Sequence, residues 1–233
     1  MISDNASWYD EYYRKEQDQF AQWYRWLIPH LRKRLKANSK VIELGCGQGQ
    51  LLRYLARERL VPPAQIYGLE QSTTAVEFVN RWLPGAHIKV GDIYNMDYPA
   101  GFFDFCFLME TIEHLNEPEK ALEGIRAIIK PGGLLYVSFP NFLHLPWLGV
   151  RLLSDLLNKP QWIVRQPIDK IYTAPEVIRI VKRAGFDYLE AVGSNYGPPI
   201  FYPWEKDWMT RSFNRMGLWW LSFHPILVFR RPT

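Results

Sequence analysis

Three glycines at alternate positions mark the segment best suited to hold a ligand. Gly45, Gly47 and Gly49 follow a short apolar stretch that carries an acid, Glu43. Because glycine has no Cβ, the chain can adopt a positive φ there and a ligand can approach the main chain closely. We expect a helix over residues 50–58, whose free N–H groups would face that ligand. The pattern is typical of a nucleotide-binding turn.

The spacing of these glycines separates two classes of ligand. A dinucleotide-binding turn has the pattern Gly-x-Gly-x-x-Gly, which would place its third glycine at position 50. Gln50 stands there instead, and the third glycine comes one residue earlier. The spacing therefore argues against a nicotinamide oxidoreductase.

The run from Glu43 to Gly49, Glu-x-Gly-x-Gly-x-Gly, resembles the first motif of class I S-adenosylmethionine-dependent methyltransferases. The resemblance implies S-adenosylmethionine as the cofactor. It also implies that Glu43 reaches the amino-acid portion of the cofactor, and that Gly45 and Gly47 lie beneath it. Cys46 and Gly49 belong to the same turn, and we expect them at the same site.

Strands and helices alternate along the rest of the chain. The residue patterns predict strands over 40–44, 65–70, 86–90, 103–109, 134–139, 186–193 and 218–230. They predict helices over 72–82, 117–130, 148–157, 174–184 and 203–216, and one or two amphipathic helices over 8–36 with a break or new start at Pro29. Such alternation indicates an α/β, doubly wound, Rossmann-like sheet. The resemblance implies seven strands in the order 3-2-1-4-5-7-6, the last antiparallel.

Acids stand at four of the first five predicted strand ends, namely Glu43, Glu70, Asp92 and Glu110. In open α/β sheets the ligand lies beyond the carboxyl ends of the strands, where the winding direction switches. A sheet with only a structural role would not gather so many carboxylates there. We therefore expect these acids to surround one site.

Glu70 closes the second predicted strand, where such folds hold a ribose whose two hydroxyls can both donate to one carboxylate. Its neighbour Gln71 is predicted to bind the cofactor as well. The alternative role for Glu70 is to cap the following helix, for which Ser72 is also suited. The upstream glycine turn favours ribose binding.

The third predicted strand is followed by Gly91-Asp92-Ile93, which resembles the third cofactor motif of the same family. The resemblance implies that Asp92 accepts from the adenine amino group and that Ile93 packs on the ring. The alternative is an ordinary turn, because Gly-Asp is a common turn pair.

Glu110 and His114 follow the fourth strand with a Glu-x-x-x-His spacing that resembles small-molecule members of the family. On an incipient helix, this spacing places both side chains on one face. Histidine titrates near neutrality, so His114 could take a proton from a substrate. Glu110 is a second candidate for this role, and we also expect it to bind the cofactor. The alternative is a structural histidine, since methyl transfer can proceed without a base once the reactants are aligned.

The resemblance covers about residues 40–139 and resumes at 172–186, where Thr173-Ala174-Pro175-Glu176 and Gly185-Phe186 resemble ubiquinone-biosynthesis-type O-methyltransferases. It implies methyl transfer to an O, N or C atom of a small, apolar or aromatic acceptor. An RNA methyltransferase and a non-catalytic cofactor-binding scaffold stay open as alternatives. The sequence leaves the acceptor, the methylated atom and the oligomeric state undetermined.

The 233 residues, 48% of them apolar, fit a single domain spanning the chain. Residues 1–37 are predicted to form a helical lid, and residues 140–171 an insertion over the substrate site. An apolar, partly aromatic substrate pocket is suggested by Trp147, Trp162, Tyr196, Phe201, Tyr202, Trp204 and Trp208. In the lid, Trp8, Tyr9, Tyr12 and Tyr13 could exclude water from the site. The alternative for each of these residues is ordinary packing.

Charge and composition limit the partners. The net charge of +4 is diffuse, and the dense basic run 32–36 suits a solvated helix end, so nucleic acid is not indicated as a partner. The histidines lack metal-ligand spacing, and we expect no metal. Two cysteines, no export signal and no apolar stretch of bilayer length predict a cytoplasmic protein, with peripheral membrane contact left open.

Overall fold

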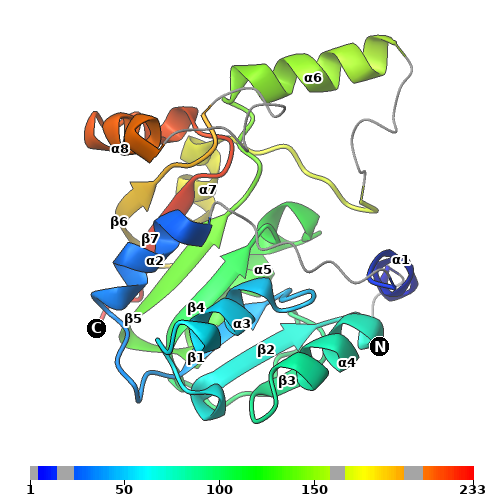
Figure 1. The fold of residues 1–233 in the computed structure, drawn as a ribbon, viewed down its shortest axis with the longest axis vertical. Coiled ribbons are helices and arrows are strands. Elements are labelled where there is room, and N and C mark those ends of the chain that lie inside the picture. Colours follow the sequence, from blue (N-terminus) through cyan, green and yellow to red (C-terminus); the bar gives the residue numbers. More distant parts are fainter. Residues whose placement is uncertain (1–4, 15–23, 158–165, 197–206) are drawn as a thin grey trace.

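The computed structural model describes residues 5–14, 24–157, 166–196 and 207–233, and it places helices on both faces of a seven-stranded sheet (Figure 1). The strands are β1 (Val41–Leu44), β2 (Ile66–Glu70), β3 (His87–Val90), β4 (Phe103–Met109), β5 (Ile129–Ser138), β6 (Asp187–Val192) and β7 (Ile226–Arg230). Their order is β3-β2-β1-β4-β5-β7-β6. Only β7 runs antiparallel to its neighbours, β5 and β6. The predicted sheet order and the antiparallel last strand are confirmed.

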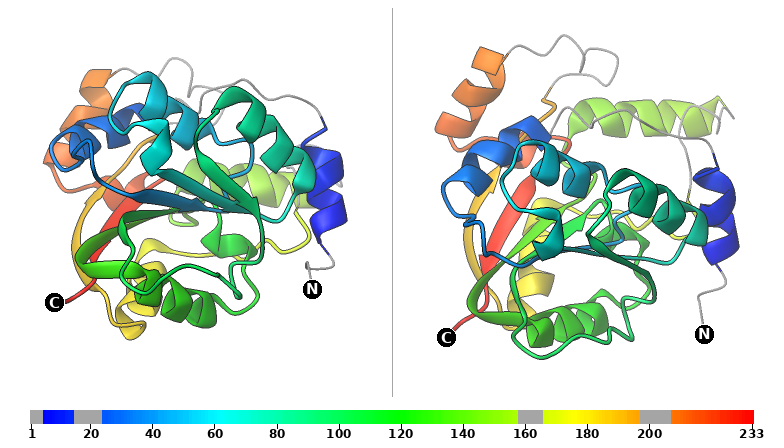
Figure 2. Two further views of the ribbon diagram at one scale, coloured as in Figure 1. Left: turned by 90° about the horizontal axis from the view of Figure 1, so that it is seen from below. Right: turned by 60° about the horizontal axis from the view of Figure 1, so that its bottom comes forward.

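Helices cover both faces of this sheet (Figure 2), and a hydrophobic cluster packs against each face. The helices are α1 (Ala6–Tyr12), α2 (Tyr24–Arg32), α3 (Gln50–Arg57), α4 (Thr73–Trp82), α5 (Pro118–Ile128), α6 (Leu145–Leu156), α7 (Ala174–Arg183) and α8 (Asp207–Arg215). Helices α2, α3 and α4 supply apolar side chains to one face. Helices α5 and α7 cover the other. With both faces buried, β4 reads as an almost continuous apolar run, as a central parallel strand should.

The centre of the sheet fixes the place of the site. β1 pairs with β2 on one side and with β4 on the other, so the winding direction switches at β1. The crevice beyond the carboxyl ends of these strands is where such sheets bind ligands. The glycine turn leaves β1 into α3 at this point, and Ser72 caps α4 beside it by accepting from the Ala75 N–H.

Several predicted boundaries were wrong. The helix expected to continue to Lys130 ends at Ile128, and β5 begins at once, because residues 130–133 bulge opposite Asp104 within the strand pairing. The last strand begins at Ile226 instead of residue 218, after a short 3-10 turn at 219–221 and Pro225, which has no N–H for a sheet. Pro29 lies inside α2 and does not start a new helix.

The N-terminal segment divides into two parts. Helix α1 lies beside α4 at one edge of the molecule, whereas α2 packs on the sheet through Leu27 and Leu31, both fully buried (Figure 1). Within the predicted lid, therefore, α2 belongs to the core. Residues 15–23, within the range 8–36 predicted as helical, fall outside the described residues.

Helix α6 lies in the predicted insertion after β5. It begins at Leu145, three residues earlier than the predicted helix, because His144 acts as its N-cap and accepts from the Trp147 N–H. No helix in the described ranges is both long and apolar enough to span a bilayer.

Candidate active site

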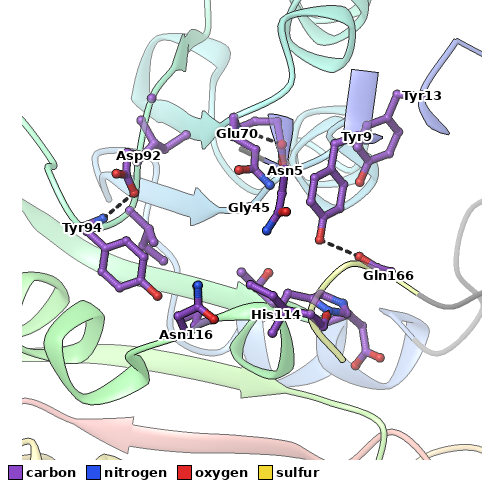
Figure 3. Close-up of a pocket in the computed structure, with 18 residues that line it drawn as sticks. Asn5, Tyr9, Tyr13, Gly45, Glu70, Asp92, Tyr94, His114, Asn116 and Gln166 are labelled. Atoms are coloured by element: carbon purple, nitrogen blue, oxygen red, sulfur yellow. Dashed lines mark hydrogen bonds between the residues drawn. The ribbon is translucent and has the colours of Figure 1, made fainter. Parts of the chain in front are cut away.

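A cavity of about 160 Å³ opens beyond the carboxyl ends of the central strands (Figure 3). The glycine turn, β2, the loop after β3 and the loop after β4 all contribute to its walls, together with α1 and the end of the insertion. Its lining residues are Asn5, Tyr9, Tyr13, Gly45, Leu69, Glu70, Gln71, Gly91, Asp92, Ile93, Tyr94, Glu110, Thr111, His114, Leu115, Asn116, Gln166 and Ile168.

The glycine turn is closely covered. All three glycines have positive φ, and a Cβ at Gly45 would lie 2.7 Å from the Thr111 Cγ2. A Cβ at Gly47 would lie 2.6 Å from the Tyr13 hydroxyl, and one at Gly49 would meet Val79 of α4. Gly45 lines the cavity, whereas Gly47 lies against Tyr13 and Gly49 against Val79 of α4.

Glu70 joins the glycine turn to the start of α4. Its carboxylate accepts from the Gly47 N–H at 2.9 Å, and from the N–H groups of Gln71 and Ser72 at 2.8 and 3.0 Å. Burial raises the pKa of this carboxyl, and the three N–H donors counteract that rise. Since Ser72 is the cap of α4, Glu70 is not the capping residue that the alternative required.

Asp92 and Ile93 both reach the cavity, after β3. Asp92 Oδ1 accepts from the Tyr94 N–H at 3.0 Å, which is the turn geometry that Gly-Asp pairs favour (Figure 3). Asp92 therefore both stabilises the turn after β3 and lines the cavity.

Glu43 and Cys46 lie behind the cavity wall. Glu43 is 2% exposed, and its Oε2 has no hydrogen-bond partner within the described residues. Burial and the neighbouring Glu70 raise the pKa of Glu43. Cys46 is buried in the core beneath the turn, close to Gly68.

Glu110 stands at the end of β4 with a φ of 50°, a conformation uncommon outside glycine. Its Oε1 accepts from the Ser138 hydroxyl at 2.7 Å, and its Oε2 lies 3.5 Å from the His224 Nε2. Burial raises the pKa of Glu110 to about 8.

His114 is held by the end of the insertion. Its Nδ1 lies 2.6 Å from the Ile168 carbonyl oxygen and donates to it, so Nε2 carries the lone pair of the neutral ring. That Nε2 is 3.6 Å from Oε1 of Glu113, a buried acid. Burial lowers the pKa of His114. The expected shared helix face was wrong, because only a 3-10 turn (Ile112–His114) forms after Glu110, but both side chains still line the cavity.

Comparison with known proteins agrees with this geometry. A family model described as a methyltransferase domain matches residues 12–191, more than half of the chain. This chain belongs to that methyltransferase family. The motif recognition, the enzyme class and S-adenosylmethionine as methyl donor are thereby confirmed.

Individual relatives are more distant. The ubiquinone biosynthesis O-methyltransferase of Cupriavidus pinatubonensis is 27% identical over 171 residues, which cover 70% of this chain and 66% of that protein. Among solved structures, the methyltransferase in a Trm112 activator complex from Haloferax volcanii has a TM-score of 0.68 at 18% identity, covering 100% of this chain and 98% of the other. A possible histamine N-methyltransferase from Thermotoga maritima has a TM-score of 0.60 at 18% identity, covering 91% and 93%. The structural matches show the same fold.

The residues of the methyltransferase site fit its cofactor. Gly45 offers bare backbone to the cavity, and Glu70 and Asp92 present carboxylates that could take a ribose and an exocyclic amine. The unpartnered Oε2 of Glu43 is an acceptor suited to an ammonium group. In the described parts of the methyltransferase, no group of His, Cys, Asp and Glu is arranged to hold a metal ion.

Helix α1 supplies cavity residues that the sequence alone did not connect to the others. Tyr9 donates from its hydroxyl to Gln166 Oε1 at 2.8 Å (Figure 3). Asp10 accepts from the Ser72 hydroxyl at 2.6 Å and from the Thr74 N–H at 3.0 Å. These contacts tie α1 to α4 and to the end of the insertion, across the cavity mouth. The tyrosines were visible as lid candidates, but no local signal pointed to Gln166.

Most of the other predicted pocket aromatics lie elsewhere. Trp147 packs on Phe223 with ring centroids 4.8 Å apart, and Tyr196 stacks on Phe213 at 4.7 Å. Trp208 is exposed on α8. Among the predicted lid residues, Trp8 stacks on Tyr12. Trp162, Phe201, Tyr202 and Trp204 lie outside the described residues. These described rings pack against other rings or face solvent, and none of them lines the cavity.

Proposed function

We propose that this methyltransferase moves a methyl group from S-adenosylmethionine to an oxygen, nitrogen or carbon of a small, apolar or aromatic acceptor. One observation carries the proposal. A single cavity joins the cofactor residues Gly45, Glu70 and Asp92 to the proton-accepting candidates Glu110 and His114.

The remaining lining supports the class of acceptor. Three tyrosines and four aliphatic side chains face the cavity, and these surfaces favour an apolar or aromatic body. They are Tyr9, Tyr13, Tyr94, Leu69, Ile93, Leu115 and Ile168. The likeness to ubiquinone biosynthesis O-methyltransferases adds a relative whose name indicates such chemistry.

When bound, S-adenosylmethionine supplies a methyl group activated by a sulfonium. The protein has to align that carbon with the acceptor atom, which is the main source of rate in such a displacement. Glu70 and Asp92 would hold the nucleoside portion, and Glu43 the amino-acid portion. His114 or Glu110 would take the proton that an O–H or N–H acceptor loses.

Helix α1 has a role in this proposal. By covering the glycine turn with Tyr13 and reaching Gln166 through Tyr9, it excludes water from the reacting atoms. The two free cysteines, both buried, suit the cytoplasmic location that we propose for the protein.

The test begins with calorimetry of the purified protein with S-adenosylhomocysteine, the demethylated product, and with reduced nicotinamide dinucleotide as the comparison ligand. We expect uptake of the first and none of the second. Transfer of a radiolabelled methyl group to a panel of catechols, aromatic amines and total RNA then identifies the acceptor class. Absence of S-adenosylhomocysteine binding would overturn the proposal. Labelling of RNA alone would favour the RNA alternative, and binding without transfer to any acceptor would favour the scaffold.

A further inference from the structure

Three polar side chains from neighbouring strands meet at one edge of the sheet. Glu110 follows β4, Ser138 ends β5, and His224 comes two residues before β7. The sheet order places β5 between β4 and β7, and β7 is antiparallel to β5. The start of β7 therefore lies at the same edge as the ends of β4 and β5, where the cavity opens.

The contacts define how His224 is oriented. Asn195 Nδ2 lies 3.2 Å from the His224 Nδ1 and donates to it. In a neutral imidazole, an accepting Nδ1 leaves the proton on Nε2. That Nε2 is the nitrogen that faces Glu110 Oε2, at 3.5 Å. Glu110 is thus approached by a donor at each oxygen, Ser138 at Oε1 and His224 at Oε2.

Backbone conformation sets these residues apart. Only three non-glycine residues in the described ranges have positive φ, and two of them are Glu110 at 50° and Asn195 at 59°. Such conformations cost free energy and persist where the surrounding structure imposes them, often at functional sites. Both residues contact His224, Asn195 at Nδ1 and Glu110 at Nε2.

The electrostatic surroundings keep His224 neutral. Burial, followed by the neighbouring His144, lowers the pKa of His224 to about 3. The titratable groups around Glu110 include Tyr24 from α2, Glu113 and His114 from the 3-10 turn, and His224. The cavity lining contains no lysine or arginine.

We propose that His224 is a positioning residue for Glu110, holding its carboxylate toward the cavity and stabilising the ionised form that accepts a proton from the methyl acceptor. This inference rests on the proposed function. As the acceptor atom forms its bond to the methyl carbon, the carbon–sulfur bond breaks and its electron pair stays on sulfur. The acceptor's proton passes to Glu110, which later releases it to solvent.

The test measures the ionisation of Glu110 directly, so it needs no identified acceptor. The protein is labelled with ¹³C at the glutamate δ-carbon, and its carboxyl resonances are followed by NMR against pH. Glu110→Gln identifies the resonance by its loss. We expect Glu110 to titrate near pH 8 in the unaltered protein, as its raised pKa indicates. In His224→Phe, which removes the Nε2–H and keeps a ring, we expect this pKa to rise by about one unit.

Two further variants separate positioning from folding. His224→Gln can offer an amide N–H to Glu110, so we expect it to restore part of the shift. His87→Phe makes the same change on β3, where the ring stacks on Tyr67 with centroids 4.6 Å apart, and it should leave the Glu110 titration unchanged. Circular dichroism melting confirms that each variant is folded.

The outcomes discriminate clearly. If folded His224→Phe leaves the pKa of Glu110 where it was, or if His87→Phe shifts it equally, the proposal is wrong. If His224→Phe does not fold, His224→Gln and Asn195→Leu decide. Asn195→Leu removes the amide that donates to the His224 Nδ1, so we expect it to shift the Glu110 pKa in the same direction as His224→Phe would. S-adenosylhomocysteine affinity is measured in parallel. Failure of that binding would reject the proposed function while leaving the Glu110–His224 coupling measurable.

Discussion

Two pairs of cavity residues are held in opposite ways. Glu70 and Asp92, on the β2 and β3 side, accept mainly from main-chain N–H groups one or two residues further along the chain. Glu110 and His114, after β4, depend on Ser138, His224 and Ile168, which lie at least 28 residues away. The first pair is therefore fixed by local backbone, and the second by the rest of the fold. The geometry of the cofactor side of the cavity therefore depends mainly on local sequence, whereas the geometry of the acceptor side depends on residues far away in the chain.

The largest effect on ligand affinity should come from replacing Glu70, which is held by local backbone. Glu70→Ala takes away the acceptor for three N–H groups and the proposed ribose contact. We expect calorimetry to show S-adenosylhomocysteine binding about 100-fold more weakly, or about 2.7 kcal/mol. Glu77→Ala, an exposed acid on α4, is the control. Equal affinity in the two variants would remove Glu70 from the cofactor site.

Glu110, which is held by residues far away in the chain, should make the stability of the protein depend on pH. The pKa of Glu110 rises from 4.5 to about 8 on folding, so the folded state binds more protons between these values. Stability contributed by the protonated carboxyl is therefore present at low pH and is lost as pH rises through this window. The unfolding free energy of Glu110→Gln, relative to that of the unaltered protein, should therefore increase by about 2 kcal/mol as the pH rises from 5 to 8.

Urea unfolding at several pH values measures this difference. The expected gain is smaller than the full shift, because 25% of the Glu110 side chain is exposed. Parallel pH curves for the two proteins would show that Glu110 ionises in the ordinary way.

A smaller effect should follow at the junction of α1 and α4. Asp10→Ala leaves the Ser72 hydroxyl and the Thr74 N–H without their acceptor, so we expect a loss of about 1 kcal/mol in unfolding free energy. Cleavage within the N-terminal segment by a protease should also become faster. Glu11→Ala, which breaks only an exposed pair with Arg14, should change neither. A similar loss in both variants would show that Asp10 has no special role.

The smallest effect concerns the contact between the lid and the insertion. Tyr9→Phe removes one hydroxyl donor to Gln166 and keeps the ring. We expect S-adenosylhomocysteine affinity to fall about threefold, roughly 0.7 kcal/mol. Tyr12→Phe, on the neighbouring face of α1 where the ring stacks on Trp8, serves as the reference. An unchanged affinity in Tyr9→Phe would mean that this bond does not help close the cavity.

The same contrast explains what the sequence could predict. β4 was predicted at its observed bounds, and the Ser72 cap and the strand-end acids were found, because each depends on a local pattern. His224 is an isolated histidine in an apolar stretch, and no motif surrounds it. Its partnership with Glu110 spans more than a hundred residues and leaves no periodic trace. The helix face expected for Glu110 and His114 failed because the positive φ of Glu110 turns the chain before a helix can begin.

The position of β7 has a consequence for how the molecule forms. β7 follows β6 in the chain yet lies between β5 and β6, so β6 has no sheet neighbour to join until β7 has been synthesised. The parallel half, from β3 to β5, can assemble from earlier residues alone. We therefore expect the edge formed by β7 and β6 to be the last part to consolidate during biosynthesis, and the step most exposed to misassembly.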